Sequence, residues 1–487
     1  MTPDYIDFHA MERPDAVALV DRGRAVTFAA FSRDIRKLTR AVRELAVPRG
    51  GAIAVACDDL YTHWLLLLAL ERLGVAAATV GSSERESAAP LLTDVDLVLS
   101  DPDFPAMGAR RQHAVTRNWL AHAFALDAED EAHPPPRSPG DPVRILRTSG
   151  TTGSRKQLAH PRSLHDAWIA RWIVLAGLTN RSRLLLTMTF TVNGMYACAS
   201  ACLRAGGTVV SVDIREIRDI VRALSDHGIT ALVLAPIQIK QVLDALPDGF
   251  ARPPSLTIYS FGAAVSEALR DRALALLATE VMDMYGSNEA GFIASMRASR
   301  DDGISAVWPG VCVEIVDERD APLPLGEMGR IRVKTPDMAQ AYLDDPAATE
   351  RMFKDGWFYP GDLAILHATR RLQIIGRGDD LLNFGGYKFP PELLERAILK
   401  NAPLGDVGVC SVRNAEGIEE LVIGISETGC DDRELLERLT AALRPFRIGH
   451  FHAVKLPSIP RNANGKIQRN LLKSAAASGL PSRPGRV

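Results

Sequence analysis

Short apolar runs alternate with segments of helical spacing along most of the first 285 residues. The runs at 51–57, 184–186 and 231–234 are expected to form buried strands, and the segments 27–46 and 61–73 are expected to form helices. Strands that alternate with helices pack as sheets covered by helices, because each element has an apolar face to bury. The alternation therefore predicts an α/β protein with layered sheets.

The pattern changes beyond residue 300, where short strand-like runs are separated by turns. The runs at 311–316, 329–334, 357–366 and 371–375 predict a β-rich subdomain within the large domain. Strand and helix patterns then return as far as Lys473, over a length sufficient for a small, mobile α+β domain. We expect a large domain at 1–376, a small C-terminal domain at 384–473 and a flexible tail at 474–487.

Length, charge and cysteine spacing narrow the class of protein. The 487 residues exceed the size at which a single core keeps growing, so two or more domains are expected. The formal net charge of −2 gives no general attraction to nucleic acid or to an anionic membrane. The most apolar run, 64–70, is cut by Glu71 and Arg72 and is too short for a membrane span. Scattered cysteines, and an N-terminus without a signal-peptide pattern, predict a cytoplasmic protein.

The segment 147–157, with the sequence RTSGTTGSRKQ, combines small hydroxyl residues and two glycines with an Arg-Lys pair. Exposed amides, hydroxyls and cationic side chains in one loop are typical of a phosphate-binding site. The spacing excludes a P-loop, because Gly150 and Gly153 are too close together and Lys156 is not followed by Ser or Thr. A polar surface loop has a similar composition, so the segment alone leaves both interpretations open.

Four further motifs follow this loop along the chain. They are YGSNE at 285–289, WFYPGD at 357–362, GRGDD at 376–380 and GKIQR at 465–469. Together with the loop, these motifs resemble those of the adenylate-forming superfamily, which includes acyl-CoA synthetases, adenylation domains of peptide synthetases and firefly luciferase. The resemblance covers nearly the whole chain. It departs from the family at Arg155, Gln157 and Asn288, where the usual residues are Pro, Gly and Thr.

The resemblance implies an ATP site assembled from these motifs. Lys156 would meet the leaving pyrophosphate, and Glu289 would bind Mg²⁺, since a carboxylate is a hard ligand for a hard cation. Tyr285 would stack on adenine, and Asp362 would accept hydrogen bonds from both ribose hydroxyls. The other nucleotide-binding residues implied by the resemblance are Thr148, Ser149, Gly150, Thr151, Thr152, Gly153, Gly262, Ala263, Gly286, Ser287, Asn288 and Arg377.

Lys466 matches the lysine that, in this family, bridges the substrate carboxylate and the α-phosphate during adenylation. Its ammonium group would neutralise charge as the pentacoordinate phosphorus forms, so Lys466, Glu289 and Lys156 are the expected catalytic residues. The segment 377–383 would form a hinge, with Asp379 as the residue about which the small domain rotates. In a thioester-forming relative, the tunnel for the incoming thiol would be bordered by Gly385, Gly386 and Lys388.

The acyl pocket is expected, again by resemblance, at Phe190, Thr191, Asn193, Gly194 and Phe261. Thr191 falls where amino-acid-activating relatives have an aspartate, and an unpaired substrate ammonium would be costly to bury. An uncharged aliphatic or aromatic carboxylic acid is therefore the expected substrate. The expected acyl acceptor is coenzyme A, and a phosphopantetheinylated carrier protein is the alternative. A relative that binds acyl groups or nucleotides without catalysis is a third, different class.

Overall fold

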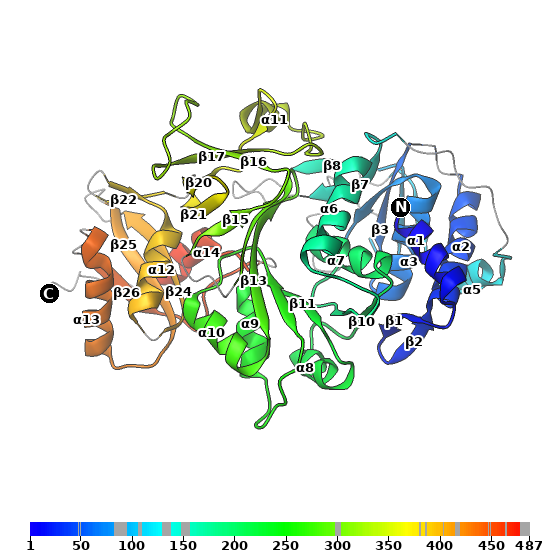
Figure 1. Cartoon of the computed structure of the whole chain (residues 1–487), viewed down its shortest axis with the longest axis horizontal. Helices are drawn as coiled ribbons and strands as arrows, with labels where there is room; N and C mark the ends of the chain where they lie inside the picture. Colours follow the sequence, from blue (N-terminus) through cyan, green and yellow to red (C-terminus); the bar gives the residue numbers. More distant parts are fainter. Residues whose placement is uncertain are drawn as a thin grey trace.

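The computed structural model describes most of the chain in three parts. The described residues are 1–46, 48, 50–81, 95–105, 110–128, 138–147, 156–297, 303–378, 381–384, 387–402, 404–413, 419–446, 448, 450–462 and 465–477. Along the longest axis of the molecule, Figure 1 shows a sheet with helices near the N-terminus, a large central sheet, and a smaller group of strands and helices near the C-terminus.

The central sheet has 15 strands. From β1 through β10, β9, β11 and β12 to β13, neighbouring strands pair in parallel, as the β-α-β order of the sequence predicts. The full order is β18 (Phe353–Lys354), β19 (Trp357–Phe358), β17 (Met328–Lys334), β20 (Asp362–Ala368), β21 (Arg371–Arg377), β15 (Ser305–Val307), β14 (Gly291–Arg297), β13 (Glu280–Ser287), β12 (Thr257–Ser260), β11 (Ala231–Leu234), β9 (Arg183–Leu185), β10 (Thr208–Ser211), β1 (Val17–Asp21) and β2 (Arg24–Thr27), with β16 (Cys312–Val316) paired to β17.

The strands expected as a β-rich subdomain belong to this same sheet, which they extend by antiparallel pairing beyond β13. The motif at 285–289 begins within a strand, because β13 continues to Ser287 and pairs with β14 through a β-bulge at Tyr285 and Gly286. The first four residues of β14 are buried, and pairing with β13 provides hydrogen-bond partners for their backbone groups in this buried position. β21 extends two residues beyond the run expected at 371–375, since it ends at Arg377.

A second sheet, of six strands, carries the two strands that flank the segment 148–155. Its order is β6 (Gln112–Ala114), β5 (Leu97–Ser100), β3 (Ala52–Ala56), β4 (Ala76–Thr79), β7 (Pro142–Arg147) and β8 (Gln157–Pro161). The strands pair in parallel except for β7 and β8, which are antiparallel. Arg147 and Gln157, which flank the expected phosphate loop, are therefore opposite each other at the end of this pair.

Helices cover both sheets of the large part. They are α1 (Thr2–Glu12), α2 (Phe28–Glu44), α3 (Leu60–Leu73), α5 (Arg117–Ala125), α6 (Arg162–Leu175), α7 (Asn193–Arg204), α8 (Ile217–Asp226), α9 (Pro236–Asp244), α10 (Glu267–Leu276) and α11 (Pro346–Met352). The most apolar run of the sequence lies in α3, which begins at the capping side chain of Asp59 and ends at Gly74. It is buried on nearly all sides, as its composition predicts.

The C-terminal part has small sheets and a hydrophobic core of its own. Its elements are β22 (Leu382–Phe384), β23 (Tyr387–Phe389), α12 (Pro391–Asn401), β24 (Leu404–Arg413), β25 (Glu419–Thr428), α13 (Asp432–Leu443), a 3-10 turn (Arg444–Phe446), β26 (Phe451–Lys455) and α14 (Arg469–Ala477). β24, β25 and β26 form one sheet, against which α12 and α14 pack. The α/β fold predicted from the sequence, with a large and a smaller part, is confirmed.

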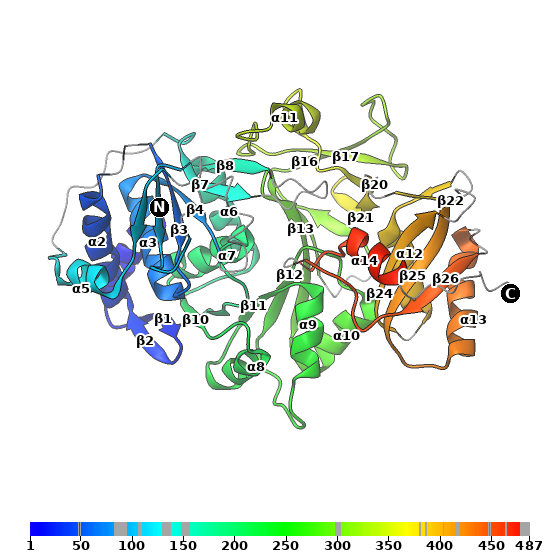
Figure 2. The same ribbon diagram turned by 180° about the vertical axis from the view of Figure 1, so that it is seen from behind.

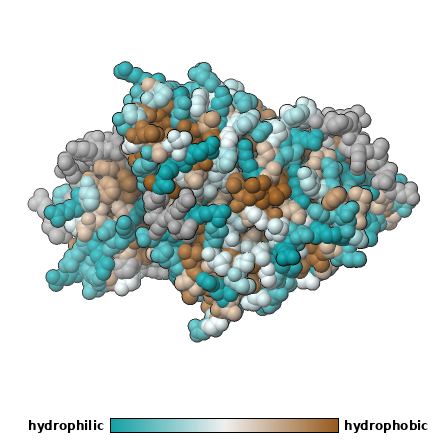
Figure 3. Space-filling view, viewed as in Figure 1, coloured by the Kyte–Doolittle hydropathy of each residue, from teal (hydrophilic) through white to brown (hydrophobic). Residues whose placement is uncertain are grey.

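Apolar side chains on the surface are interrupted by hydrophilic ones on the face drawn in Figure 3. The large hydrophobic residues that remain exposed, such as Tyr5, Val174, Leu325 and Leu471, come from distant parts of the chain. Among the described residues, no helix combines the length and the apolar composition needed to cross a bilayer.

Replacing Leu68 in α3 with alanine tests how far the core depends on this helix. Leu68 is fully buried, so we expect Leu68→Ala to lower the free energy of unfolding by about 2–5 kcal/mol. Urea denaturation followed by tryptophan fluorescence is a suitable measurement, because Trp64 and Trp172 are buried in the same core cluster. The matched control is Leu325→Ala at an exposed position, and equal effects of the two changes would contradict the expectation.

Candidate active site

A cavity of about 2350 Å³ is lined by residues of the central sheet and of the C-terminal part. The parallel strands β9, β11 and β12 are neighbours, so the segments that follow them open on one edge of the sheet, where ligands of such sheets bind. The predicted site residues that line this cavity are Lys156, Thr191, Asn193, Gly194, Phe261, Gly262, Ala263, Tyr285, Gly286, Ser287, Asn288, Glu289, Asp362, Arg377 and Lys466.

Asp362 is held at the start of β20 by two donors. The Tyr285 hydroxyl donates to Oδ2 at 2.5 Å, and Nη1 of Arg377 lies 3.3 Å from Oδ1. Arg377 is the cross-strand neighbour of Asp362 on β21, and it also donates to the carbonyl of Pro360 at 2.6 Å. Burial raises the pKa of Asp362, while Arg377, the Tyr285 hydroxyl and Lys466 lower it. The carboxylate is thus oriented before any ligand arrives.

Glu289 lies in the turn between β13 and β14 and is only 7% exposed. Its Oε1 atom accepts a hydrogen bond of 2.7 Å from the hydroxyl of Tyr342. Burial and the negative charge of Glu289 raise the pKa of Tyr342, so the phenol keeps its proton and acts as the donor. In the same turn, the Ser287 hydroxyl accepts from the amide of Ala290 at 3.2 Å. The turn therefore directs Glu289 toward Tyr342, which sequence reasoning did not identify.

Lys156 lies beside the same tyrosine. Its Nζ atom is 4.9 Å from the centroid of the Tyr342 ring and 3.3 Å from Sδ of Met352. Burial lowers the pKa of Lys156, and the nearby guanidinium of Arg351 lowers it further. Arg351 lines the cavity as well and is a second residue that the sequence motifs did not identify. Two cations and the Glu289 carboxylate therefore face one region of the cavity.

This charge arrangement suits Mg²⁺ bound together with phosphate. Among the described residues, no group of three or more Asp, Glu, His or Cys side chains forms a protein cage for a metal. Mg²⁺ in nucleotide sites usually takes one or two carboxylates and obtains its other ligands from water and phosphate oxygens. Glu289 supplies such a carboxylate, and Lys156 and Arg351 supply charge for phosphates beside it. The residues present therefore fit the metal that the motifs imply.

The other end of the cavity is less charged. Asn193, the first residue of α7, is 4% exposed, and neither its Oδ1 nor its Nδ2 atom has a partner among the described residues. The Phe261 ring lies against Gly194, where a Cβ atom would be 3.1 Å from Cζ of the ring. The Thr191 hydroxyl is 2.7 Å from that of Thr189. The predicted acyl-pocket residues at this end carry no charged side chain.

Phe190, which was also expected in the acyl pocket, lies in the core. Its ring packs between Trp64 and Tyr196, with centroid distances of 5.0 and 5.3 Å, and it does not line the cavity. Its carbonyl accepts a hydrogen bond of 3.2 Å from the buried side chain of Arg144 on β7. These contacts of Phe190 therefore anchor to the core the segment that continues to Thr191 and Asn193.

Lys466 reaches the cavity from the C-terminal part. Gly465 has a φ of +75°, and a Cβ atom there would lie 3.0 Å from the Cβ of Ala235, at the start of α9. A side chain would therefore be strained by the backbone and crowded by Ala235. Seen from behind, the segment before α14 lies close to α9 (Figure 2). The charge of Lys466 is close enough to lower the pKa of Asp362.

Several predicted site residues lie outside the described part of the chain. They are Thr148, Ser149, Gly150, Thr151, Thr152, Gly153, Asp379, Gly385 and Gly386. Lys388 belongs to β23, and nothing is described of its side chain. Their roles in phosphate binding, hinge motion and the thiol tunnel remain predictions.

Comparison with known proteins places these motifs in a family. Residues 6–343 match the family model "AMP-binding enzyme". The chain is 25% identical to fatty acid–[acyl-carrier-protein] ligase ScoC of Streptomyces coeruleorubidus, over 96% of this chain and 94% of that protein. It is 24% identical to indoleacetate–CoA ligase of Aromatoleum aromaticum, over 97% of this chain and 98% of that protein.

Solved structures share the fold. The crystal structure of ATP-bound MatB from Rhodopseudomonas palustris matches with a TM-score of 0.86 at 21% identity, covering 97% of this chain and 99% of MatB. O-succinylbenzoate coenzyme A synthetase from Bacillus subtilis, in complex with ATP and a magnesium ion, matches with a TM-score of 0.80 at 20% identity, covering 96% and 99% of the two chains. With the family model spanning well over half of its length, the chain belongs to the AMP-binding enzymes, the adenylate-forming superfamily that its motifs resemble.

Proposed function

We propose that the protein uses Mg²⁺ and ATP to convert a carboxylic acid into an acyl-adenylate, and then transfers the acyl group to the thiol of coenzyme A. The observation that carries this proposal is the meeting of Lys466 with Asp362, Glu289 and Lys156 around one cavity. A carboxylate and a triphosphate repel each other, so a site that joins them needs cations placed around both. The relatives support an AMP-forming ligase, while the choice of thiol is our own inference.

Adenylation assigns a task to each part of the cavity. A carboxylate oxygen of the acid attacks the α-phosphorus, and the bond to the β-phosphate oxygen breaks to release pyrophosphate. Lys466 would neutralise the charge that develops between the carboxylate and the α-phosphate, while Lys156 would hold the leaving pyrophosphate. Asp362 would fix the ribose, and Glu289 would hold Mg²⁺, which offsets charge on the phosphates when bound.

Thioester formation needs no protein nucleophile. The thiol loses its proton, the sulfur attacks the acyl carbon, and the bond to the AMP oxygen breaks. We propose that the small domain rotates between the two steps about the hinge at 377–383, with Asp379 as the pivot. The rotation would withdraw Lys466 and open a tunnel bordered by Gly385, Gly386 and Lys388. The contribution of the protein is then positioning and charge neutralisation.

The acid is proposed to be uncharged apart from its reacting carboxylate. Thr191, Asn193, Gly194 and Phe261 offer no carboxylate for a substrate ammonium, which would be costly to bury unpaired. The Phe261 ring suits an aliphatic or aromatic wall, and the side-chain amide of Asn193, which has no partner among the described residues, suits a polar substituent. A carrier-protein thiol is the second candidate acceptor, because ScoC is named as an acyl-carrier-protein ligase.

Pyrophosphate exchange with a panel of acids tests the adenylation step directly. We expect incorporation of labelled pyrophosphate into ATP with aliphatic or aromatic acids, and little with α-amino acids. The reason is that position 191 holds a threonine and not an aspartate that could pair with the substrate ammonium. Comparison of coenzyme A with a phosphopantetheinylated carrier protein then identifies the acceptor. Absence of exchange by a well-folded protein with every class of acid would contradict the enzymatic proposal. It would favour the alternative of a relative that binds acyl groups or nucleotides without catalysis.

Replacement of Lys466 with alanine separates the two half-reactions. We expect Lys466→Ala to lower the rate of pyrophosphate exchange by roughly 100-fold or more, since it removes a cation from the transition state. Thioester formation from pre-made acyl-adenylate should change little, because the lysine is withdrawn in that step. Rapid quench assays of each half-reaction provide the measurement, and an equal loss in both would contradict the rotation.

Replacement of Tyr342 with phenylalanine tests the metal site. The change removes the hydrogen bond to Glu289, so we expect the Mg²⁺ concentration for half-maximal exchange to rise roughly 10-fold. Tyr61→Phe is the control, because that hydroxyl bonds to Asp34 in another part of the large domain. If Tyr342→Phe and the control needed the same Mg²⁺ concentration, the proposed role of Tyr342 in orienting Glu289 for the metal would be contradicted.

A further inference from the structure

The segment that carries Lys466 is a turn closed by its own hydrogen bonds. The amide of Asn462 donates to the carbonyl of Lys466 at 2.9 Å, and the amide of Lys466 donates to Oδ1 of Asn462 at 3.0 Å. The amide of Gln468 donates to the carbonyl of Pro460 at 2.9 Å and closes the outer end. These bonds link the described residues of the turn, 460–462 and 465–468, so the placement of Lys466 depends on what holds the turn.

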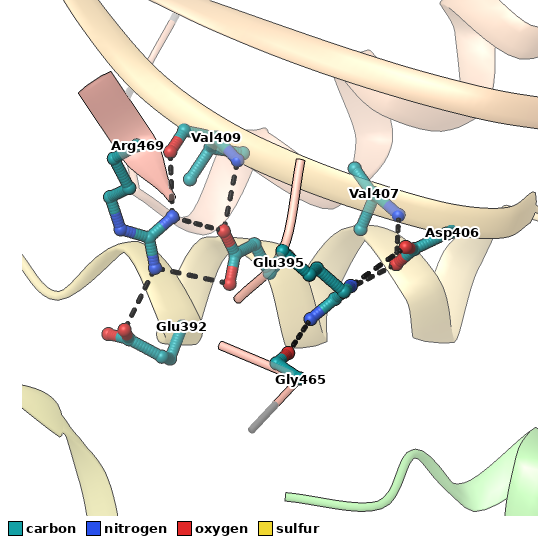
Figure 4. A network of polar contacts seen from close by, with 8 residues as sticks. Glu392, Glu395, Asp406, Val407, Val409, Gly465 and Arg469 are labelled. Carbon is teal, nitrogen blue, oxygen red and sulfur yellow. Dashed lines mark hydrogen bonds and ion pairs between the residues drawn. The ribbon is translucent and has the colours of Figure 1, made fainter. Parts of the chain in front are cut away.

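Arg461 joins this turn to the body of the C-terminal part. Its Nε and Nη2 atoms donate to the two carboxylate oxygens of Asp406 at 3.1 and 2.7 Å. Its Nη1 atom donates to the carbonyl of Gly465, the residue before Lys466, at 2.6 Å. Figure 4 shows Asp406 and Gly465 joined through one guanidinium, with the amide of Val407 also donating to Asp406. A planar fork of this kind fixes both direction and distance.

A second arginine has a different set of contacts. Arg469 donates to Glu395 at 2.6 Å, to Glu392 at 2.8 Å and to the carbonyl of Val409 at 2.9 Å (Figure 4). These bonds join α12, β24 and α14, so Arg469 holds the C-terminal part together as a whole. Arg461 differs because its guanidinium contacts the lysine turn itself.

We infer that Arg461, held by Asp406, is a positioning residue for Lys466 in the adenylation step. The inference rests on the proposed function, because it assigns Arg461 a role only in the reaction that uses Lys466. The guanidinium fixes the carbonyl of Gly465 relative to β24, and the turn then moves with the C-terminal part as one body. Lysine has a flexible four-carbon side chain, so its ammonium can be placed accurately only if its backbone is held.

The site where the turn docks leaves little tolerance for misplacement. Gly465 meets the start of α9 so closely that a single added Cβ atom would contact Ala235. A shift of about 1 Å in a reacting group can cost roughly 100-fold in rate, so loss of Arg461 should be visible in the chemistry. The ion pair is partly accessible, with 18% of the Arg461 side chain and 16% of Asp406 exposed. Removing one partner would leave the other largely buried without its counter-charge, so some loss of stability is expected as well, and the two half-reaction assays separate it from positioning.

The test replaces Arg461 with methionine, which keeps an unbranched side chain and removes the guanidinium. We expect Arg461→Met to lower kcat for pyrophosphate exchange roughly 10- to 100-fold, with little change in KM for ATP. Thioester formation from pre-made acyl-adenylate should stay within about twofold of wild type, because Lys466 takes no part in it. Arg433→Met is the matched control, since among the described residues the side chain of that arginine bonds to Glu437 alone, on the exposed face of α13.

The same change in the Lys466→Ala protein distinguishes positioning from a structural role. If Arg461 acts through Lys466, Arg461→Met should lower the residual exchange less than about twofold in this background. Asp406→Asn provides a second route that does not need the weak Lys466→Ala activity. It should reproduce the effect of Arg461→Met in the wild-type background, and the double variant should be no slower than either single variant.

Several outcomes would overturn the inference. Equal losses in both half-reactions, equal factors in the two backgrounds, or additive effects of the Arg461 and Asp406 changes would each indicate general destabilisation. Exchange by Arg461→Met at the wild-type rate would overturn the positioning role alone and leave the proposed function intact. If the folded wild-type protein gave no pyrophosphate exchange with any acid, both the positioning role and the proposed function would be overturned.

Discussion

The contact between Gly465 and the start of α9 determines which charges the cavity holds. It brings the lysine turn of the C-terminal part against the edge where β9, β11 and β12 end, so that Lys466 lies near Asp362. With the turn elsewhere, the cavity would keep Glu289, Asp362 and Lys156 but lose the cation proposed for the α-phosphate. The proposed adenylation and the proposed domain rotation would therefore both depend on one close contact, between the backbone of Gly465 and the side chain of Ala235.

Arg144 provides a related constraint within the large part. It lies on β7, three residues before Arg147, and its fully buried guanidinium donates to Thr79 on β4 and to the carbonyl of Phe190. Burial lowers the pKa of Arg144, and its charge lies 4.0 Å from the centroid of the Tyr196 ring. One side chain thus links β7, which leads to the proposed phosphate loop, to the segment proposed to line the acyl pocket.

The sequence predicts those parts of this site whose residues belong to short local motifs. Strand and helix order follows from periodicity, and Glu289, Asp362, Arg377 and Lys466 follow from motif resemblance. Tyr342 and Arg351 could not be found in this way, because their meaning comes from long-range packing: Tyr342 is 53 residues from its partner Glu289. Phe190 was expected in the acyl pocket but lies in the core, and the sequence could not show this because its burial depends on how α3 and α7 pack around it.

The proposed rotation would leave the ion pairs around the lysine turn intact. Arg461, Asp406, Arg469, Glu392 and Glu395 all belong to the C-terminal part, so their ion pairs travel with Lys466. Among the described residues, contacts that cross to the large part include the 3.4 Å bond from Arg396 to the carbonyl of Ile374 and the close approach of Gly465 to Ala235. The charge of Arg396 also interacts with the buried carboxyl group of Asp283. Because the ion pairs of Arg461 and Arg469 lie within the C-terminal part, the lysine turn would stay fixed to that part in adenylation and would leave with it as a unit in the proposed rotation.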